Sequence, residues 1–198
     1  MTRPLSFGQI HVSLNRLGLA VVETPWYLNL IGIRSAGSAN AFDDRLALAW
    51  FQDGRACLLV FTCTTDPGLH WRRHPITERG TAILKPGHYP GLWSLGLHRG
   101  QYEALVQRGP CTVFRDSDRD GQLDTAGARE ETGLFGINCH RAAEACQPTT
   151  VGRWSAGCQV LPDSADFGLL LALARKHISS YGNRIGYTLI EEKDLWTP

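Results

Sequence analysis

Two residues in the second half of the chain, His140 and Cys158, are of the types that a thiol-dependent acyl transfer requires. A cysteine attacks a carbonyl as a thiolate, so it needs a neighbouring imidazole that accepts its proton and stabilises the ion pair. A low-pKa Cys158 of this kind should be alkylated rapidly at about pH 6 and should lose that reactivity when His140 is removed. Because sequence separation does not fix proximity in space, a structural role for both residues is the alternative.

The turn that carries the cysteine, Ser155-Ala156-Gly157-Cys158, consists of small residues. Ala156 and Gly157 leave room for a substrate carbonyl beside the sulfur, and backbone N–H groups of this turn could hold the developing oxyanion. Ser155 has two interpretations. Its hydroxyl donates to the oxyanion or leaving group, or it bonds to the local backbone, as serines in such turns commonly do.

The pattern formed by His140 and Ser155-Ala156-Gly157-Cys158 resembles the signature of the L,D-transpeptidase catalytic domain, the YkuD-like family, in which a histidine is followed by Ser-His-Gly-Cys. The likeness extends upstream to residues 64–68 and 80–89 and spans roughly residues 45–190. It implies that Cys158 attacks the peptide stem of peptidoglycan, that His140 is the base, and that the backbone carbonyl of Arg141 orients the imidazole.

Two positions depart from the family pattern. Ala156 replaces the second histidine of Ser-His-Gly-Cys, and Val160 stands where an arginine or asparagine often follows the cysteine. The first difference bears on substrate preference, and the second removes a polar anchor. Arg141, Arg153 or Arg99 would then hold a stem-peptide carboxylate, because guanidinium pairs with carboxylate in a planar fork.

Several nearby side chains have two interpretations, one as part of a substrate cleft and one as part of the structure. Trp154 would wall the substrate groove or lie in the core, where large aromatics dominate burial. His98 and His88 would approach the cleft or act as neutral, hydrogen-bonded histidines. Arg153 would bind substrate or be a solvated turn residue.

Segment 116–124, Asp-Ser-Asp-Arg-Asp-Gly-Gln-Leu-Asp, places carboxylates at alternate positions around a glycine, as in the first half of a calcium loop. The twelfth position, where an EF-hand has a bidentate glutamate, is Gly127, and no convincing helix precedes the segment, so an EF-hand is not expected. The favoured interpretation is an acidic turn bonded to its own backbone without a metal. A cation held by Asp116, Asp118 and Asp120 would be structural.

The elements that must position these residues are mostly strands. Short runs rich in β-branched and aromatic residues, bounded by turn-forming residues, predict about eight of them. These runs are 27–34, 45–51, 56–64, 80–84, 91–97, 111–115, 133–140 and 185–191. Most spacings are too short for crossover helices, so the sheet should be mainly antiparallel or mixed.

One helix is clear and another is weak. Segment 163–178 has acidic and hydroxyl residues at its start, basic residues near its end and an apolar stripe, and His177 is expected to cap its C-terminus. A weaker helical pattern covers 100–107. The expected fold is α+β, mainly β with one or two helices, and the resemblance implies a β-sandwich of the L,D-transpeptidase type in a single catalytic domain, 1–198.

Charge and cysteine usage exclude several classes of protein. The 198 residues hold 20 Lys and Arg against 19 Asp and Glu, so no basic field favours nucleic acid or an anionic membrane surface. No apolar run is long enough to insert stably in a membrane, and residues 1–10 lack the core of a secretory signal. The six cysteines contain no C-x-x-C pair for zinc and are expected to be mostly reduced, with a bridge between Cys139 and Cys146 as the alternative.

We therefore expect a cysteine-dependent enzyme that acts without a cofactor on peptidoglycan stem peptides through a thioester at Cys158. Water as acceptor would make it an L,D-carboxypeptidase or endopeptidase, and an amine would make it a transpeptidase. Made in the cytoplasm, it would reach the wall through lysis, a virion or a contractile apparatus, with any delivery or immunity partner unidentified. The alternative is a non-catalytic wall-binding or calcium-stabilised module.

Overall fold

The structure is a computed structural model that describes residues 5–37 and 40–195. Its strands are β1 Asn29–Arg34, β2 Asp44–Gln52, β3 Arg55–Cys63, β4 Thr81–Leu84, β5 Gly87–His98, β6 Tyr102–Gln107, β7 Cys111–Asp116, β8 Arg129–Gly133, β9 Cys139–Arg141, β10 Gln159–Leu161 and β11 Ile185–Glu191. Its helices are α1 Phe7–Arg16, α2 Leu69–Arg73, α3 Ser164–Tyr181 and a short 3-10 helix, Glu192–Leu195.

Eight strands form one large mixed sheet in the order β10-β9-β6-β5-β11-β1-β2-β3, and β4, β7 and β8 form a second sheet. The β1–β11 and β9–β10 pairs are parallel, and the other pairs are antiparallel. The two edges of the large sheet meet where Thr64, directly after β3, exchanges backbone hydrogen bonds of 2.8 and 3.0 Å with Val160 of β10. This closure fixes the turn before β10, which carries Cys158.

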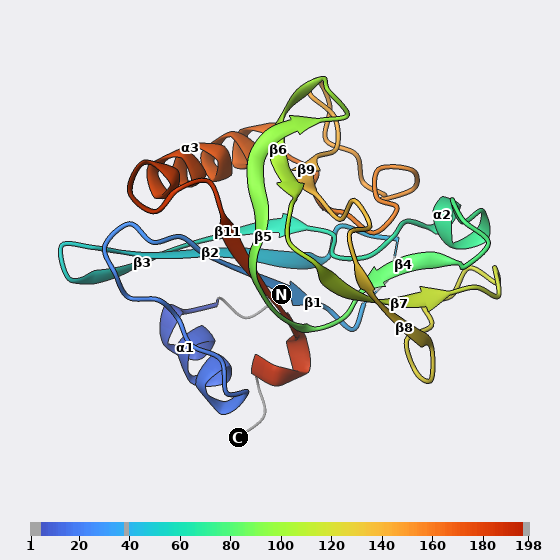
Figure 1. Ribbon diagram of the computed structural model, residues 1–198, viewed down its shortest axis with the longest axis horizontal. Helices are drawn as coiled ribbons and strands as arrows, with labels where there is room; N and C mark the ends of the chain where they lie inside the picture. Colours follow the sequence, from blue (N-terminus) through green and yellow to red (C-terminus); the bar gives the residue numbers. More distant parts are fainter. Residues whose placement is uncertain (1–4, 38–39, 196–198) are drawn as a thin grey trace.

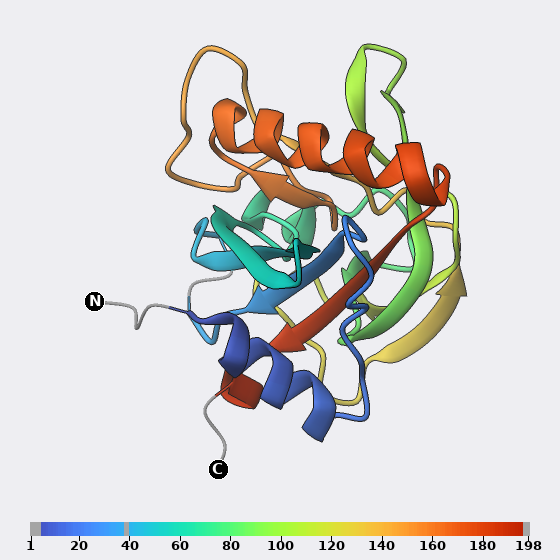
Figure 2. The ribbon, with the colours of Figure 1, turned by 90° about the vertical axis from the view of Figure 1, so that its left-hand side faces the viewer.

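The two longer helices lie on opposite sides of the large sheet, as Figure 1 and Figure 2 show. Helix α3 begins at Asp163, whose side chain accepts the N–H groups of Ala165 and Asp166, and it buries Leu170 and Ala174 against the sheet. Helix α1 begins with a capping box between Ser6 and Gln9 and packs its apolar face in a second core cluster beside β1 and β2.

The mixed, mainly antiparallel α+β architecture is confirmed, and seven of the expected strands correspond to β1, β2, β3, β4, β5, β7 and β11. Helix α1 was not predicted. His177 does not cap α3. It is fully buried, and its Nδ1 lies 3.1 Å from the backbone nitrogen of Leu28, whose N–H it accepts.

Two predicted elements are wrong. Segment 100–107 contains strand β6 rather than a helix, because Tyr102–Gln107 pairs with β5 along its whole length. Such tertiary pairing overrides a weak local pattern. Segment 133–140 is not one strand. β8 ends at Gly133 and β9 begins at Cys139, and in between the side-chain oxygen of Gln107 accepts the N–H groups of Phe135 and Ile137, each at 2.9 Å.

None of the helices in the described ranges has the length and apolar character needed to cross a lipid bilayer. Residues 1–4 and 196–198, at the ends of the expected single domain, lie outside the described part of the chain, as does part of the segment on which the expectation about a secretory signal rests.

Candidate functional site

Strands β9 and β10 bring His140 and Cys158 to one region of the large sheet. The strands are adjacent and parallel, with Val160 opposite His140 and Gln159 opposite Cys139. Cys158 directly precedes β10, and its Sγ accepts the N–H of Asn138, two residues before His140, at 3.4 Å, which places the sulfur next to the segment that carries the imidazole. Gln159 is buried, and Tyr187 donates to it at 2.8 Å.

The His140 imidazole is held in one orientation. Its Nδ1 lies 2.7 Å from the backbone carbonyl oxygen of Arg141, and the side chain is only 5% exposed. The hydroxyl of Tyr102 donates to the same carbonyl at 3.2 Å, and the ring of His98 stacks on His140 with centroids 4.2 Å apart. Donation from Nδ1 to the carbonyl leaves Nε2 as the nitrogen that can accept a proton.

The thiol of Cys158 rests on the loop before β9. Its Sγ donates to the carbonyl oxygen of Gly136 at 3.4 Å and accepts the N–H of Asn138 at 3.4 Å. Across the described ranges, no hydrogen bond joins this sulfur to the imidazole of His140. The resting site therefore holds a thiol and a base that are not hydrogen-bonded to each other. Rotation about the Cα–Cβ bond of Cys158 would free the sulfur from Gly136.

Both groups are neutral near pH 7. Burial raises the pKa of Cys158, and the N–H of Asn138 and the charge of Arg99 offset that rise only in part. Burial lowers the pKa of His140 to about 4; the carbonyl of Arg141 opposes this, and the nearby His98 adds to it. This corrects the sequence-based expectation of a low-pKa thiolate, because the site is too dry to hold an ion pair before substrate arrives.

We expect Cys158 to react slowly with iodoacetamide at about pH 6, and the rate to keep rising through its ordinary pKa of 9.0, because the thiol pKa is raised. Turnover should instead persist to about pH 5, because His140, with a pKa of about 4, stays a neutral base there. Peptide mass spectrometry separates Cys158 from the exposed Cys146, which serves as the accessibility reference. A plateau in the Cys158 rate below about pH 7 would contradict the neutral pair.

Ser155 builds the cysteine turn. Its buried hydroxyl donates to the carbonyl of Cys158 at 2.8 Å and accepts the N–H of Gly157 at 3.1 Å. Local backbone bonding is therefore the interpretation that the structure bears out for Ser155, and in this conformation the N–H of Gly157 is not available to an oxyanion. The N–H of Cys158 has no hydrogen-bond partner among the described residues, which makes it the donor that this turn offers.

Glycine is required at position 157. Its φ is +123°, and a Cβ atom there would lie 2.4 Å from the carbonyl oxygen of Ala82 in β4. Any other residue would push the turn away from the second sheet, so the position of Cys158 depends on this close approach.

An open cleft of about 790 Å³ lies beside His140. It is lined by His140 and the expected substrate residues His98, Arg99, Arg141, Arg153 and Trp154, together with Tyr102, Cys146 and the segment 142–145, whereas Cys158 is not among its lining residues. Trp154 is 41% exposed and so belongs to the cleft wall rather than the core. His88 is elsewhere, with its Nδ1 2.9 Å from Oγ1 of Thr188, and the idea that it approaches the cleft is wrong.

The arginines that line the cleft differ in whether their guanidinium groups already contact other side chains. The guanidinium of Arg141 lies 4.2 Å from the ring centroid of Tyr102 and donates to Glu144 at 3.0 Å, so it is already engaged. Arg99 and Arg153 are exposed, and Arg99 occupies the tip of the β5–β6 hairpin with φ of +51°. A substrate carboxylate would therefore meet Arg99 or Arg153 more readily than Arg141.

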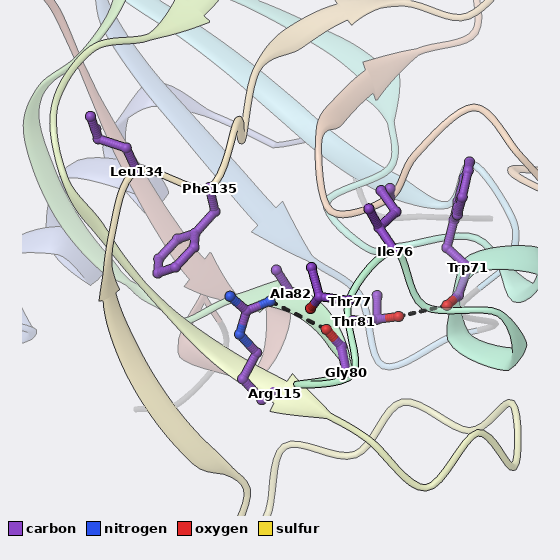
Figure 3. A pocket seen from close by; sticks show the side chains of 10 residues that line it. Trp71, Ile76, Thr77, Gly80, Thr81, Ala82, Arg115, Leu134 and Phe135 are labelled. Atoms are coloured by element: carbon purple, nitrogen blue, oxygen red, sulfur yellow. Dashed lines mark hydrogen bonds between the residues drawn. The ribbon is translucent and has the colours of Figure 1, made fainter.

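A smaller hollow of about 280 Å³ adjoins the cysteine turn and is lined in part by Ala156, the position of the missing histidine. Figure 3 shows Trp71 and Ile76 on one side of it and Phe135 and Arg115 on the other. Two hydrogen bonds stabilise its edge. The Thr81 hydroxyl donates to the carbonyl of Trp71 at 2.6 Å, and Arg115 donates to the carbonyl of Gly80 at 3.2 Å. Sequence reasoning did not find this hollow.

All six cysteines are free thiols. Cys139, the first residue of β9, is fully buried in the core, whereas Cys146 is exposed at the cleft. The Cys139–Cys146 bridge is therefore absent, and the unpaired interpretation matches the structure.

Comparison of the chain with protein-family models, curated proteins and solved structures found no match.

Proposed function

We propose that the chain is a cysteine-dependent acyl-transfer enzyme of the L,D-transpeptidase type that acts on peptidoglycan stem peptides. The observation that carries the proposal is the 2.7 Å contact between Nδ1 of His140 and the carbonyl oxygen of Arg141, on the strand adjacent to the Cys158 turn. A buried imidazole fixed in this way presents Nε2 as a base, which a merely structural histidine would not need.

In the proposed reaction, Nε2 of His140 accepts the thiol proton as Sγ of Cys158 attacks the scissile carbonyl. The N–H of Cys158 donates to the oxyanion of the tetrahedral intermediate. His140 then returns the proton to the leaving amine, the C–N bond breaks, and a thioester remains on Cys158. Attack by water releases a carboxylate and attack by an amine forms a new amide, with His140 taking the acceptor's proton and the thiolate recovering it.

The cleft supports a peptide substrate that carries a carboxylate. It is open, and the side chains of Arg99, Arg153 and Trp154 line it. Guanidinium groups suit the free carboxylates of a stem peptide, and an exposed tryptophan gives apolar contact to its backbone.

Mass spectrometry of purified muropeptides after incubation with the protein tests this function. We expect loss of a terminal D-amino acid or cleavage of a cross-link when water is the acceptor, and a product of higher mass when an amine is the acceptor. Cys158→Ala is the matched control and should leave every muropeptide mass unchanged. If the wild-type protein also leaves all masses unchanged, the catalytic proposal is wrong.

A second candidate, a non-catalytic wall-binding module, is favoured by one observation: Sγ of Cys158 is hydrogen-bonded to the carbonyl of Gly136 rather than to His140. Such a module would sediment with isolated cell walls, and neither Cys158→Ala nor His140→Ala would alter that binding.

A further inference from the structure

Three carboxylates gather after strand β7. One side-chain oxygen each of Asp116, Asp118 and Asp124 lies within 4.8 Å of the others. Asp120, expected to belong to this group, is not among the three. Its side chain accepts the N–H of Gln122 at 2.6 Å, and one oxygen of Asp118 likewise accepts the N–H of Asp120 at 3.0 Å, so part of the expected bonding of this turn to its own backbone is present. No helix precedes the segment, because Asp116 is the last residue of β7.

The burial of the Asp116 carboxylate is a second observation, separate from the clustering of the three side chains, that indicates a bound cation. The residue is only 2% exposed, and both of its side-chain oxygens are buried without a hydrogen-bond partner among the described residues. A bare buried carboxylate is costly, and carboxylates that crowd together at this distance repel one another. Burial, Asp118 and Asp124 raise the pKa of Asp116 to about 6, and Arg72 opposes this only in part.

We propose that Asp116, Asp118 and Asp124 bind a Ca²⁺ ion. All three ligands are carboxylate oxygens, without the imidazole or thiolate that zinc and copper prefer, and such a set suits a hard cation. Asp118 and Asp124 are exposed, and Asp124 borders an open hollow of about 740 Å³, which gives a hydrated ion access and leaves room for the water ligands that complete the shell.

The cation would stabilise the cysteine turn through α2. The loop is tied to α2 by Arg72, which donates to the carbonyl of Gly121 at 2.6 Å. Residues at the start of α2 reach the turn: the N–H of Gly68 donates to the carbonyl of Ser155 at 2.9 Å, and the indole of Trp71 donates to the carbonyl of Arg153 at 3.0 Å. Ordering of the acidic loop is thus transmitted to residues 153–155 by a short chain of bonds.

Calorimetric titration of chelator-treated protein with Ca²⁺, together with thermal unfolding, tests the site. We expect saturable binding and a rise in Tm of about 5–10 °C at a hundredfold excess over Kd. Asp118→Asn and Asp124→Asn should each weaken Ca²⁺ binding at least about tenfold. Asp116→Asn, which keeps the size of the side chain, should lose the response to Ca²⁺ without a lower Tm in its absence, because it also removes charge repulsion.

Asp53→Asn is the matched control. It changes an exposed carboxylate in the β2–β3 turn and should leave Ca²⁺ binding unchanged. The proposal is overturned if up to about 10 mM Ca²⁺, above the range of weak extracellular calcium modules, gives neither heat nor a shift in Tm. It is also overturned if Asp118→Asn responds as the wild type does, or if Mg²⁺ binds as tightly as Ca²⁺. These readouts do not involve turnover, so they stand apart from the proposed function.

Discussion

Replacing Cys158 by alanine or by serine should lower turnover of stem peptides by about 10⁴-fold or more, because both variants remove the sulfur on which the proposed thioester forms. Serine keeps a nucleophilic atom, but its hydroxyl is far more basic than a thiol, and His140, with a pKa of about 4, is too weak a base to activate it. The fold should survive, since the half-buried sulfur makes only two weak hydrogen bonds, to Gly136 and Asn138. Muropeptide turnover and far-UV circular dichroism measure the two effects.

Cys63→Ala is the matched control for Cys158. Cys63 is 1% exposed in the main core, so its replacement should destabilise the protein by about 1–2 kcal/mol while turnover is retained. Full activity in a folded Cys158→Ala protein would rule out the thioester mechanism.

Replacing His140 by alanine should lower turnover by about 10²–10⁴-fold, the usual contribution of a general base. The thiol pKa is raised by burial, so without the imidazole little thiolate forms at neutral pH. Added imidazole should restore part of the rate, because the substitution opens space for it next to Cys158. A rate restored in proportion to the neutral form of the added base would identify a proton-transfer role rather than damage to the fold.

His177→Ala is the corresponding control. His177 is also fully buried and accepts the N–H of Leu28, so its loss should lower Tm but leave the turnover of the folded protein and its pH profile unchanged. If His140→Ala behaved as His177→Ala does, His140 would be structural.

Tyr102→Phe, which removes the hydroxyl that donates to the carbonyl of Arg141, should cause a smaller loss in turnover than His140→Ala.

The fold was predictable where apolar runs end at turn-forming residues. Segment 185–191 coincides with β11, and Asp163 and Gly182 bound α3, because these boundaries depend on local chemistry. Prediction failed where distant partners decide the structure. The apolar side chains of β6 are spaced as in a helix, and only the pairing with β5 makes this segment a strand. No local sequence pattern indicates that the amide of Gln107 takes the place of a strand partner between Gly133 and Cys139.

The candidate site was predictable in its residue types but not in its electrostatics. The resemblance pointed to Cys158, His140 and the carbonyl of Arg141, and the structure brings these three into one region. It could not indicate that His140 is only 5% exposed or that Tyr102, on the neighbouring strand β6, donates to the carbonyl that orients the imidazole, since both depend on packing. For the acidic loop, the spacing of the carboxylates was visible, but the burial of Asp116 was not.

Gln107 lies outside the cleft, yet it determines what the resting thiol touches. Its amide nitrogen donates to the carbonyls of Gly109 and Gly133 at 2.9 and 3.1 Å. Its amide oxygen accepts the N–H groups of Phe135 and Ile137, so the side chain binds the backbone on both sides of Gly136. Loss of this amide would leave the N–H groups of Phe135 and Ile137 without their acceptor, so the loop that presents the Gly136 carbonyl to Cys158 would lose its anchor. The resting position of the thiol therefore depends on a side chain outside the cleft.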